Sequence, residues 1–212
     1  MNVLVIAPHP DDESIGCGGS ICQHADAGHR VVSVFLTSGE LGLKKLSREA
    51  AWQIREAEAH AAAKILGIVE THFLRQPDWT LGDAIEPTAA ALAAILSSER
   101  FGLIYLPHSD EWHPDHKAAG AVLRRACSIA DILASEIRAY EVWTPLAQYD
   151  VVADITSVMP RKLQAIRAHT SQLHEIDYAR ATEGLNAYRG AIASRTLFAE
   201  VFSLHGDFRP HI

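Results

Sequence analysis

The stretch VLVIAPHPDDE, residues 3–13, carries most of the information about the fold of this chain. Its first five residues form a continuous apolar run, which is typical of a parallel strand covered by helices on both faces. Two prolines, one histidine and three acids follow at once, so these side chains come at the carboxyl end of the strand. In open α/β sheets ligands bind beyond the carboxyl ends of the strands. The stretch therefore predicts an α/β fold with a functional site at the end of its first strand.

The rest of the chain alternates short β-branched runs with longer alanine-rich stretches, the pattern of βαβ units. Further strands are predicted at 30–37, 71–75, 102–106, 137–143 and 151–155. Helices are predicted at 15–27, 47–66, 87–99, 114–129, 157–173 and 178–194. No linker or internal repeat divides the sequence, so we expect residues 1–212 to form a single Rossmann-like α/β domain, with a mostly parallel sheet flanked by helices.

The composition restricts the partners and the location of the protein. The 19 Lys and Arg against 26 Asp and Glu give a formal net charge of -7, which argues against nucleic acid as the main partner. No apolar stretch approaches the roughly 20 residues of a spanning helix, and the first residues lack the basic region of a secretory signal. The three cysteines match no zinc-finger or CxxC spacing and are expected to be reduced. We expect a cytoplasmic protein with no membrane insertion.

The first cluster of chemically active residues is His9, Asp11, Asp12 and Glu13. Adjacent carboxylates repel one another, and a divalent cation relieves that repulsion. His9 and Asp12 lie three residues apart in a loop restrained by prolines, so both side chains can face one metal ion, which leaves Asp11 to face a metal-bound water. The alternative is an ordinary helix N-terminus, where acids complement the helix dipole.

A second cluster, HSDEWHPDH at 108–116, follows the predicted strand at 102–106. His113 and His116 flank a proline at the predicted start of a helix. Together the two clusters offer a zinc site formed by His9, Asp12 and His116, with water in the fourth position, as catalytic zinc sites have. Two histidines and one carboxylate also suit iron(II).

A glycine-rich segment, GCGGS at 16–20, begins like a dinucleotide-binding motif. The last glycine of G-x-G-x-x-G would fall on Ile21, and the preceding acids repel a pyrophosphate. We interpret these glycines as positions where the helix approaches the sheet and the metal loop closely.

With these residues in place, the chain resembles the LmbE-like, or PIG-L, zinc-dependent N-acetylglucosamine deacetylases. The resemblance spans nearly the whole chain and implies a Rossmann-like fold that removes an N-acetyl group from a small glucosamine-containing molecule. It also matches His9, Asp12 and His116 to the family's metal ligands. The motifs that carry it are APHPDDE at 7–13, TSGELG at 37–42, Arg55-x-x-Glu58, HPDH at 113–116, Asp154-Ile-Thr, Lys162 and His169-x-Ser171-Gln172.

The resemblance assigns roles to four further residues. Asp11 matches the general base that activates the water, and His113 matches the residue that stabilises the oxyanion or assists the departing amine. Asp115 matches the carboxylate that orients His113. Arg55 matches a position whose guanidinium often reaches the substrate sugar.

Residues that bind the substrate are harder to assign. Ser38, in TSGE after the second strand, either lines the substrate site or belongs to a plain turn. Trp79, Trp112 and Trp143 either stack on a sugar ring or pack in the core, and Trp112 is the favoured sugar contact. Some relatives carry a tyrosine before the HxxH pair, where this chain has Asp110-Glu111-Trp112.

The partner implied is a small N-acetylated amino sugar, and the sequence does not identify its aglycone. Homo-oligomers are frequent in the family that the chain resembles, so the resemblance favours a homo-oligomer without fixing the number of subunits. His169 is expected to serve helix packing. The alternative function is a non-catalytic sugar- or metal-binding domain, which needs neither Asp11 nor His113. Phosphoester hydrolysis usually needs two metals and further cationic side chains, which the sequence does not offer.

Overall fold

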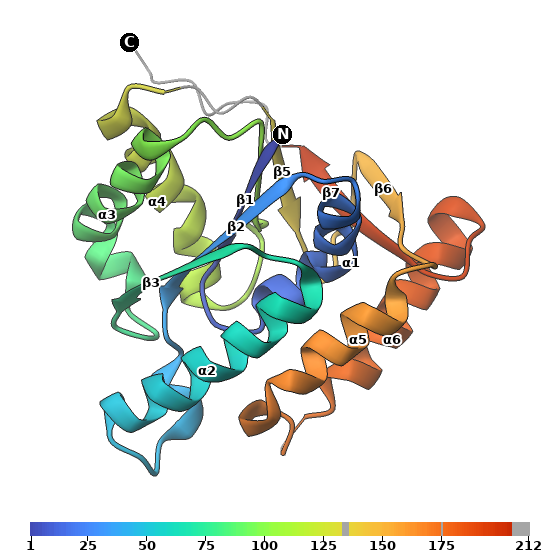
Figure 1. Cartoon of the computed structure of the whole chain (residues 1–212), viewed down its shortest axis with the longest axis horizontal. Coiled ribbons are helices and arrows are strands. Elements are labelled where there is room, and N and C mark those ends of the chain that lie inside the picture. Colours follow the sequence, from blue (N-terminus) through green and yellow to red (C-terminus); the bar gives the residue numbers. More distant parts are fainter. Residues whose placement is uncertain (133–135, 175, 205–212) are drawn as a thin grey trace.

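The computed structural model describes residues 1–132, 136–174 and 176–204, which form one α/β domain (Figure 1). The strands are β1 (Asn2–Ala7), β2 (Arg30–Thr37), β3 (Glu70–Gln76), β4 (Leu103–Pro107), β5 (Ile137–Tyr140), β6 (Val151–Asp154) and β7 (Ala199–Leu204). The α-helices are α1 (Asp12–Asp26), α2 (Arg48–Leu66), α3 (Ile85–Ser98), α4 (Pro114–Ala130), α5 (Met159–Ala168) and α6 (Tyr178–Arg189). Short helical turns are η1 (Glu40–Leu43), η2 (Leu81–Ala84), η3 (Thr170–Gln172) and η4 (Gly190–Ser194).

The seven strands lie in the order β3-β2-β1-β4-β5-β7-β6. Strands β1 to β5 are parallel to one another, whereas β7 runs antiparallel to both β5 and β6. The strand order reverses between β1 and β4, which are hydrogen bonded to each other. This is the switch point of an open α/β sheet, where the loops that follow the two strands diverge and leave room for a ligand.

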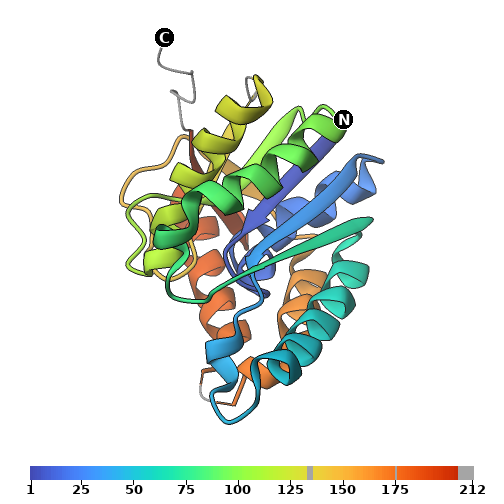
Figure 2. The ribbon, with the colours of Figure 1, turned by 90° about the vertical axis from the view of Figure 1, so that its left-hand side faces the viewer.

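Helices cover both faces of the sheet, and β1 shows how (Figures 1 and 2). Val3 and Val5 belong to one core cluster, with residues of α1, α2 and α5. Leu4 and Ile6 belong to the other cluster, with residues of α3 and α4. The apolar run of β1 is thus buried from both sides, as its composition predicts.

Helix α1 is kinked at Cys17, whose φ of -140° is not helical. The amide N–H groups of Gly19 and Ser20, just after the kink, donate to the Glu200 carboxylate of β7 at 2.7 and 2.8 Å. Lys162 of α5 donates to the same carboxylate at 2.7 Å, and both side chains are buried. Glu200 therefore serves as a distant cap for the second half of α1.

The predicted elements agree with the structure in type and order, but several differ in extent. The strand predicted at 137–143 ends at Tyr140, and the helix predicted at 178–194 ends as an α-helix at Arg189. Strand β7 was not predicted, and α1 begins at Asp12 rather than near residue 15, so two acids lie in its first turn. The predicted helix at 157–173 is shorter and ends at Ala168, before η3. Gly16 confirms the interpretation of the glycine segment, because a Cβ there would lie 2.2 Å from the Tyr140 ring.

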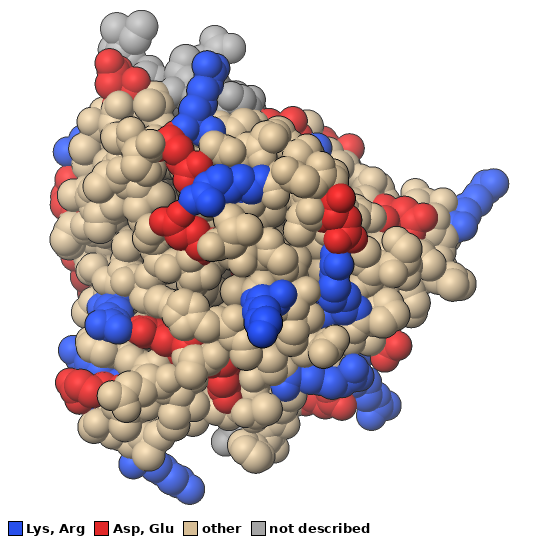
Figure 3. Space-filling view, in the orientation of Figure 1, with Lys and Arg blue, Asp and Glu red and all other residues tan. Residues whose placement is uncertain are grey.

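Two surface properties bear on the expected partners. Lys and Arg side chains are interspersed with Asp and Glu on the face shown in Figure 3. Within the described ranges, no helix is both long and apolar enough to cross a lipid bilayer.

Candidate metal centre and active site

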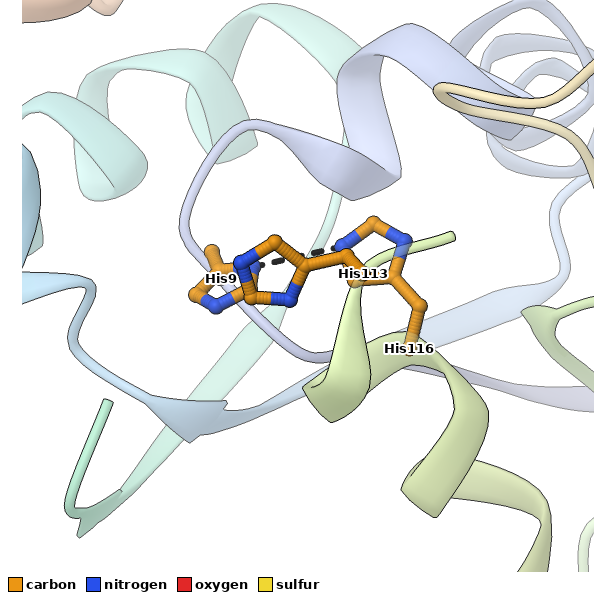
Figure 4. Close-up of side chains that lie close together, drawn as sticks. All are labelled: His9, His113 and His116. Atoms are coloured by element: carbon orange, nitrogen blue, oxygen red, sulfur yellow. Dashed lines mark hydrogen bonds between the residues drawn. The ribbon is translucent and has the colours of Figure 1, made fainter. Parts of the chain in front are cut away.

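Three polar side chains meet where the loops after β1 and β4 face each other. His9 lies in the loop after β1, Asp12 opens α1, and His116 lies in the first turn of α4, fixed there by Pro114 at its first position. The Oδ2 atom of Asp12 lies 3.2 Å from Nδ1 of His9 and 3.1 Å from Nε2 of His116. The two histidine nitrogens are 3.3 Å apart (Figure 4).

These separations fit a metal ion. Zinc–nitrogen bonds of about 2.0–2.1 Å place the ligand atoms of a tetrahedral site about 3.3–3.4 Å from one another. The donor set of two imidazoles and one carboxylate, all buried, is also that of a catalytic zinc or iron(II) site. Two overlapping groups of donor atoms converge here as well, His9 with His113 and His116, and His9 with Asp78, His113 and Asp115.

The charges of the site favour a cation. Burial lowers the pKa of His9, but its hydrogen bonds to Asp115, Asp12 and Asp78 outweigh burial and raise that pKa well above the ordinary value. Burial raises the pKa of Asp12, but His116 and His9 outweigh it and hold that pKa well below its usual range. Three carboxylates around one imidazole thus stabilise positive charge at this point.

Asp11 lies beside the three converging side chains in a strained backbone conformation, with φ 122°. Burial raises the pKa of the Asp11 carboxyl to about 6, although Arg55 opposes the shift by donating to its Oδ2 atom at 3.2 Å. Arg55 is 3% exposed and also donates to the backbone carbonyls of Pro10 and Gly39. Its guanidinium therefore holds the Asp11 loop, and its contact with a substrate sugar stays a prediction.

Gly39 makes room for this arginine. Its φ is +62°, and a Cβ there would lie 2.8 Å from the guanidinium carbon of Arg55. The glycine of the TSGELG motif is therefore required both by its left-handed backbone and by the close approach of a buried cation.

His113 caps α4, and its Nδ1 atom accepts the N–H of Asp115 at 3.3 Å. The ring proton is thereby assigned to Nε2. Burial, with His9 and His116 close by, lowers the pKa of His113 to about 4, so the ring is neutral near pH 7. His113 is thus a neutral hydrogen-bond donor next to the site.

The Asp115 carboxylate is hydrogen bonded to His9, and its predicted role in orienting His113 stays a prediction. Its Oδ2 atom lies 3.1 Å from Nε2 of His9, and the carboxylate also accepts the backbone N–H groups of Trp79 and Leu81 at 2.8 and 3.0 Å. Asp115 therefore positions His9 and connects the loop after β3 to the site, and its backbone amide donates to His113.

The two predicted substrate contacts lie in different surroundings. Ser38 is fully buried and donates to Glu56 at 2.7 Å, so its hydroxyl is engaged away from the converging side chains. Trp112 is 53% exposed and packs against His113, with ring centroids 5.5 Å apart. The structure therefore places Trp112 beside His113 and engages the Ser38 hydroxyl with Glu56, and substrate binding by either residue stays a prediction.

Asp78 is a site residue that the sequence analysis missed. Its Oδ1 atom lies 3.2 Å from Nε2 of His9, and its Oδ2 atom accepts the N–H of Leu41 at 3.0 Å. It lies in the loop QPDWTLGD, which follows β3 on the same side of the sheet. Its position just after a third parallel strand is the feature of the sequence that could have indicated a site residue.

Glu13 and His169 make a contact next to Asp11 that the sequence did not predict. The Glu13 carboxylate accepts the backbone N–H of Asp11 at 3.0 Å and lies 3.5 Å from Nε2 of His169. His169 is 1% exposed, and neither of its ring nitrogens has a hydrogen-bond partner among the described residues. This contact connects the end of α5 to the Asp11 loop. Helix periodicity, on which the sequence-based prediction for His169 depends, does not predict such a contact.

The third missed residue is Glu111, which is fully buried. Its carboxylate accepts the backbone N–H groups of Val142, Trp143 and Thr144 at 2.7 to 3.3 Å and lies 3.9 Å from Nδ1 of His116. Glu111 therefore joins the loop after β5 to a candidate metal ligand.

The profile of the GlcNAc-PI de-N-acetylase (PIG-L) family matches residues 4–127, which include both ligand-bearing loops. The chain belongs to the PIG-L family. A diacetylchitobiose deacetylase of Thermococcus kodakarensis is 35% identical to this PIG-L protein, over 82% of this chain and 70% of the relative. A probable N-acetyl-α-D-glucosaminyl L-malate deacetylase of Bacillus cereus is 32% identical, over 81% and 83% of the two chains.

A solved structure shares the fold of this PIG-L chain. The N,N′-diacetylchitobiose deacetylase of Pyrococcus horikoshii, solved with an inhibitor, is 27% identical and superposes with a TM-score of 0.84 over 96% of this chain and 83% of its own. The predicted family and fold class are thereby confirmed, and the homologues are deacetylases of N-acetylglucosamine compounds.

Proposed function

We propose that this PIG-L protein hydrolyses the N-acetyl group of a small N-acetylglucosamine-containing molecule. The metal is held by His9, Asp12 and His116, and Asp11 is the general base. The observation that carries the proposal is the convergence of three ligand atoms, 3.1 to 3.3 Å apart, next to a buried carboxyl held by Arg55. Zinc, or iron(II) in its place, would supply a Lewis acid that polarises the amide and makes a water more acidic.

The residues of the chain divide the proton transfers between them. Asp11 accepts one proton from the attacking water as the water oxygen bonds to the amide carbon, and returns this proton to nitrogen as the C–N bond breaks. The products are acetic acid and an amine, which at neutral pH are present as acetate and an ammonium ion. His113, with its proton on Nε2, donates a hydrogen bond to the oxyanion that forms. Arg55 keeps Asp11 in place, and Asp115 and Asp78 hold the His9 ring.

The binding-only alternative is weaker on one observation. Asp11 keeps a φ of 122°, a conformation that costs on the order of 1–3 kcal/mol for a residue other than glycine. A domain that merely holds a metal or a sugar has no use for a strained carboxyl that is not a ligand. A catalytic base, by contrast, must stay at a fixed place beside the metal.

The test is acetate release from N-acetylglucosamine and simple glucosaminides, with chelator and with added zinc or iron(II). We expect activity that the chelator abolishes and a metal restores. In Asp11→Asn, metal content by elemental analysis stays equal to the parent, while turnover falls by about 10²- to 10⁴-fold. Full activity in metal-loaded Asp11→Asn contradicts the assignment of the base, and absence of acetate from every substrate favours the binding-only alternative. Cytoplasmic location and a homo-oligomeric state stay predictions.

A further inference from the structure

Two tryptophans at the mouth of the site have no role in the proposed chemistry. Trp79 follows β3 and is 47% exposed, and Trp112 precedes α4 and is 53% exposed. Both rings pack against His113, with centroid separations of 4.6 and 5.5 Å. Their own centroids are 6.3 Å apart at an angle of 56°. Two large aromatic surfaces therefore face solvent next to the proposed oxyanion donor.

The fold holds both rings in place, although rings that are half exposed contribute less to stability than buried ones. Trp79 has a φ of +71°, which is unfavourable for a bulky residue, and its backbone N–H donates to the Asp115 carboxylate at 2.8 Å. The backbone N–H of Trp112 donates to the Thr144 hydroxyl at 3.2 Å. The Trp112 ring packs against half-buried Trp143, with ring centroids 5.9 Å apart. Strain and exposure that a fold maintains at a site mark a place where a ligand binds.

We infer that Trp79 and Trp112 form two successive stacking positions for an oligosaccharide or a glycoside with a ring-shaped aglycone. Trp79, nearer to His113, packs on the N-acetylglucosamine ring. Trp112 packs on the pyranose or cyclitol ring linked to it. Aromatic faces bury the apolar C–H faces of such rings over a large area. This inference rests on the proposed function, because it takes the acetamido group to lie at the metal.

The charges near the pair disfavour an acidic aglycone. Asp78 precedes Trp79, and exposed Asp110 lies two residues before Trp112. Since the Asp78 carboxylate is engaged with His9 and Leu41, exposed Asp110 is the charge that would repel an anionic aglycone near Trp112, whereas a neutral sugar ring would not be repelled. The surroundings therefore select a neutral ring over a small anionic group such as malate.

The test measures binding and so does not depend on turnover. In metal-loaded Asp11→Asn, calorimetry gives the affinities of N,N′-diacetylchitobiose, N-acetylglucosamine and its malate glycoside. We expect the disaccharide to bind about tenfold more tightly than the other two. Adding Trp112→Ala removes this preference, Trp112→Phe keeps it, and Trp79→Ala weakens the disaccharide and the monosaccharide together. Tyr188→Ala, an exposed aromatic on α6, is the matched control and keeps the preference.

Three outcomes overturn the inference: equal affinities for monosaccharide and disaccharide, tighter binding of the malate glycoside, or a preference that survives Trp112→Ala. Circular dichroism of each variant shows whether it is folded, and Trp112→Phe supplies a second reading if the alanine variant is not. Since binding is measured in a variant that lacks the base, a failure of the proposed deacetylation is read separately, from acetate release by the parent protein.

Discussion

The carboxylate of Asp115 lies 3.1 Å from Nε2 of His9, on the side of the ring opposite to the nitrogen that faces Asp12 and His116. A carboxylate in this place fixes the ring orientation and increases the electron density on the ligating nitrogen. The same carboxylate holds the N–H groups of Trp79 and Leu81. One side chain therefore connects the metal ligand, the loop after β3 and the proposed sugar subsite.

Asp115→Asn is accordingly expected to weaken metal binding by about 10- to 100-fold without unfolding the protein. A neutral amide still bonds to the ring but no longer donates charge density to it. Competition with a chromophoric chelator gives the affinity. Asp110→Asn, an exposed carboxylate in the same segment, is the matched control and keeps the affinity of the parent. Equal affinities in the two variants would remove Asp115 from the metal site.

Glu111→Gln tests the anchor of the loop after β5. The Glu111 carboxylate accepts three backbone N–H groups, and an amide side chain replaces one acceptor oxygen with a donor that faces those N–H groups. We expect the free energy of unfolding to fall by about 2–3 kcal/mol, the scale of a hydrogen bond to a charged group. Urea denaturation followed by circular dichroism measures it. Glu183→Gln, an exposed glutamate on α6, should change it by less than about 0.5 kcal/mol, and an equal loss in both variants contradicts the anchoring role.

The ends of β1 and β4 show what the sequence could predict. An apolar run followed at once by His9 and Asp12, and another followed by His116, give both the strands and the ligands, because parallel strands put their carboxyl ends on one edge. The role of Asp78 and the contact of His169 with Glu13 could not be predicted from the sequence, for a physical reason. Asp78 contacts His9, and His169 contacts Glu13. In both cases the packing of helices and loops brings together segments that are distant in sequence, and no local sequence pattern shows this.

Strand β7 illustrates a second limit. Its sequence AEVFSL contains Glu200, a residue that disfavours a buried strand unless its charge is paired. The partners that make its burial possible are Lys162 and the amides of the α1 kink, all distant in sequence. Since these partners are distant in sequence from β7, neither the strand nor its role as a cap was predictable from local propensity.

The buried ion pair of Lys162 and Glu200 gives a further prediction. Lys162→Met leaves Glu200 charged and buried, with only the amides of Gly19 and Ser20 and the Ser20 hydroxyl as partners, so we expect a loss of about 3–5 kcal/mol in the free energy of unfolding. Adding Glu200→Gln removes the unpaired charge, so the double variant should lose less than the sum of the two single losses. Denaturant titrations of the four proteins measure the coupling. Lys64→Met, an exposed lysine of α2, is the control, and strict additivity would mean that the pair is not coupled.

His24 makes stability depend on pH at a place remote from the metal loops. Burial, with His29 next to it, lowers the pKa of His24 to about 4, and its ring bonds to the Tyr105 hydroxyl at 3.0 Å. The unfolded chain, with an ordinary histidine pKa near 6.5, binds a proton below that pH that the folded chain does not bind. Stability should therefore fall as the pH drops from about 6.5 to about 4, by on the order of 1 kcal/mol for a half-buried ring screened by solvent.

The measurement is the free energy of unfolding of the metal-loaded protein from urea titrations at several pH values in this window. His24→Gln can still bond to Tyr105 but does not titrate, so its stability should depend less steeply on pH than that of the parent. His174→Gln, an exposed histidine outside the helices and strands, should keep the parent slope. Identical slopes for the parent and His24→Gln would show that the proton uptake on unfolding arises elsewhere, because linkage ties the slope to the groups whose pKa differs between the two states.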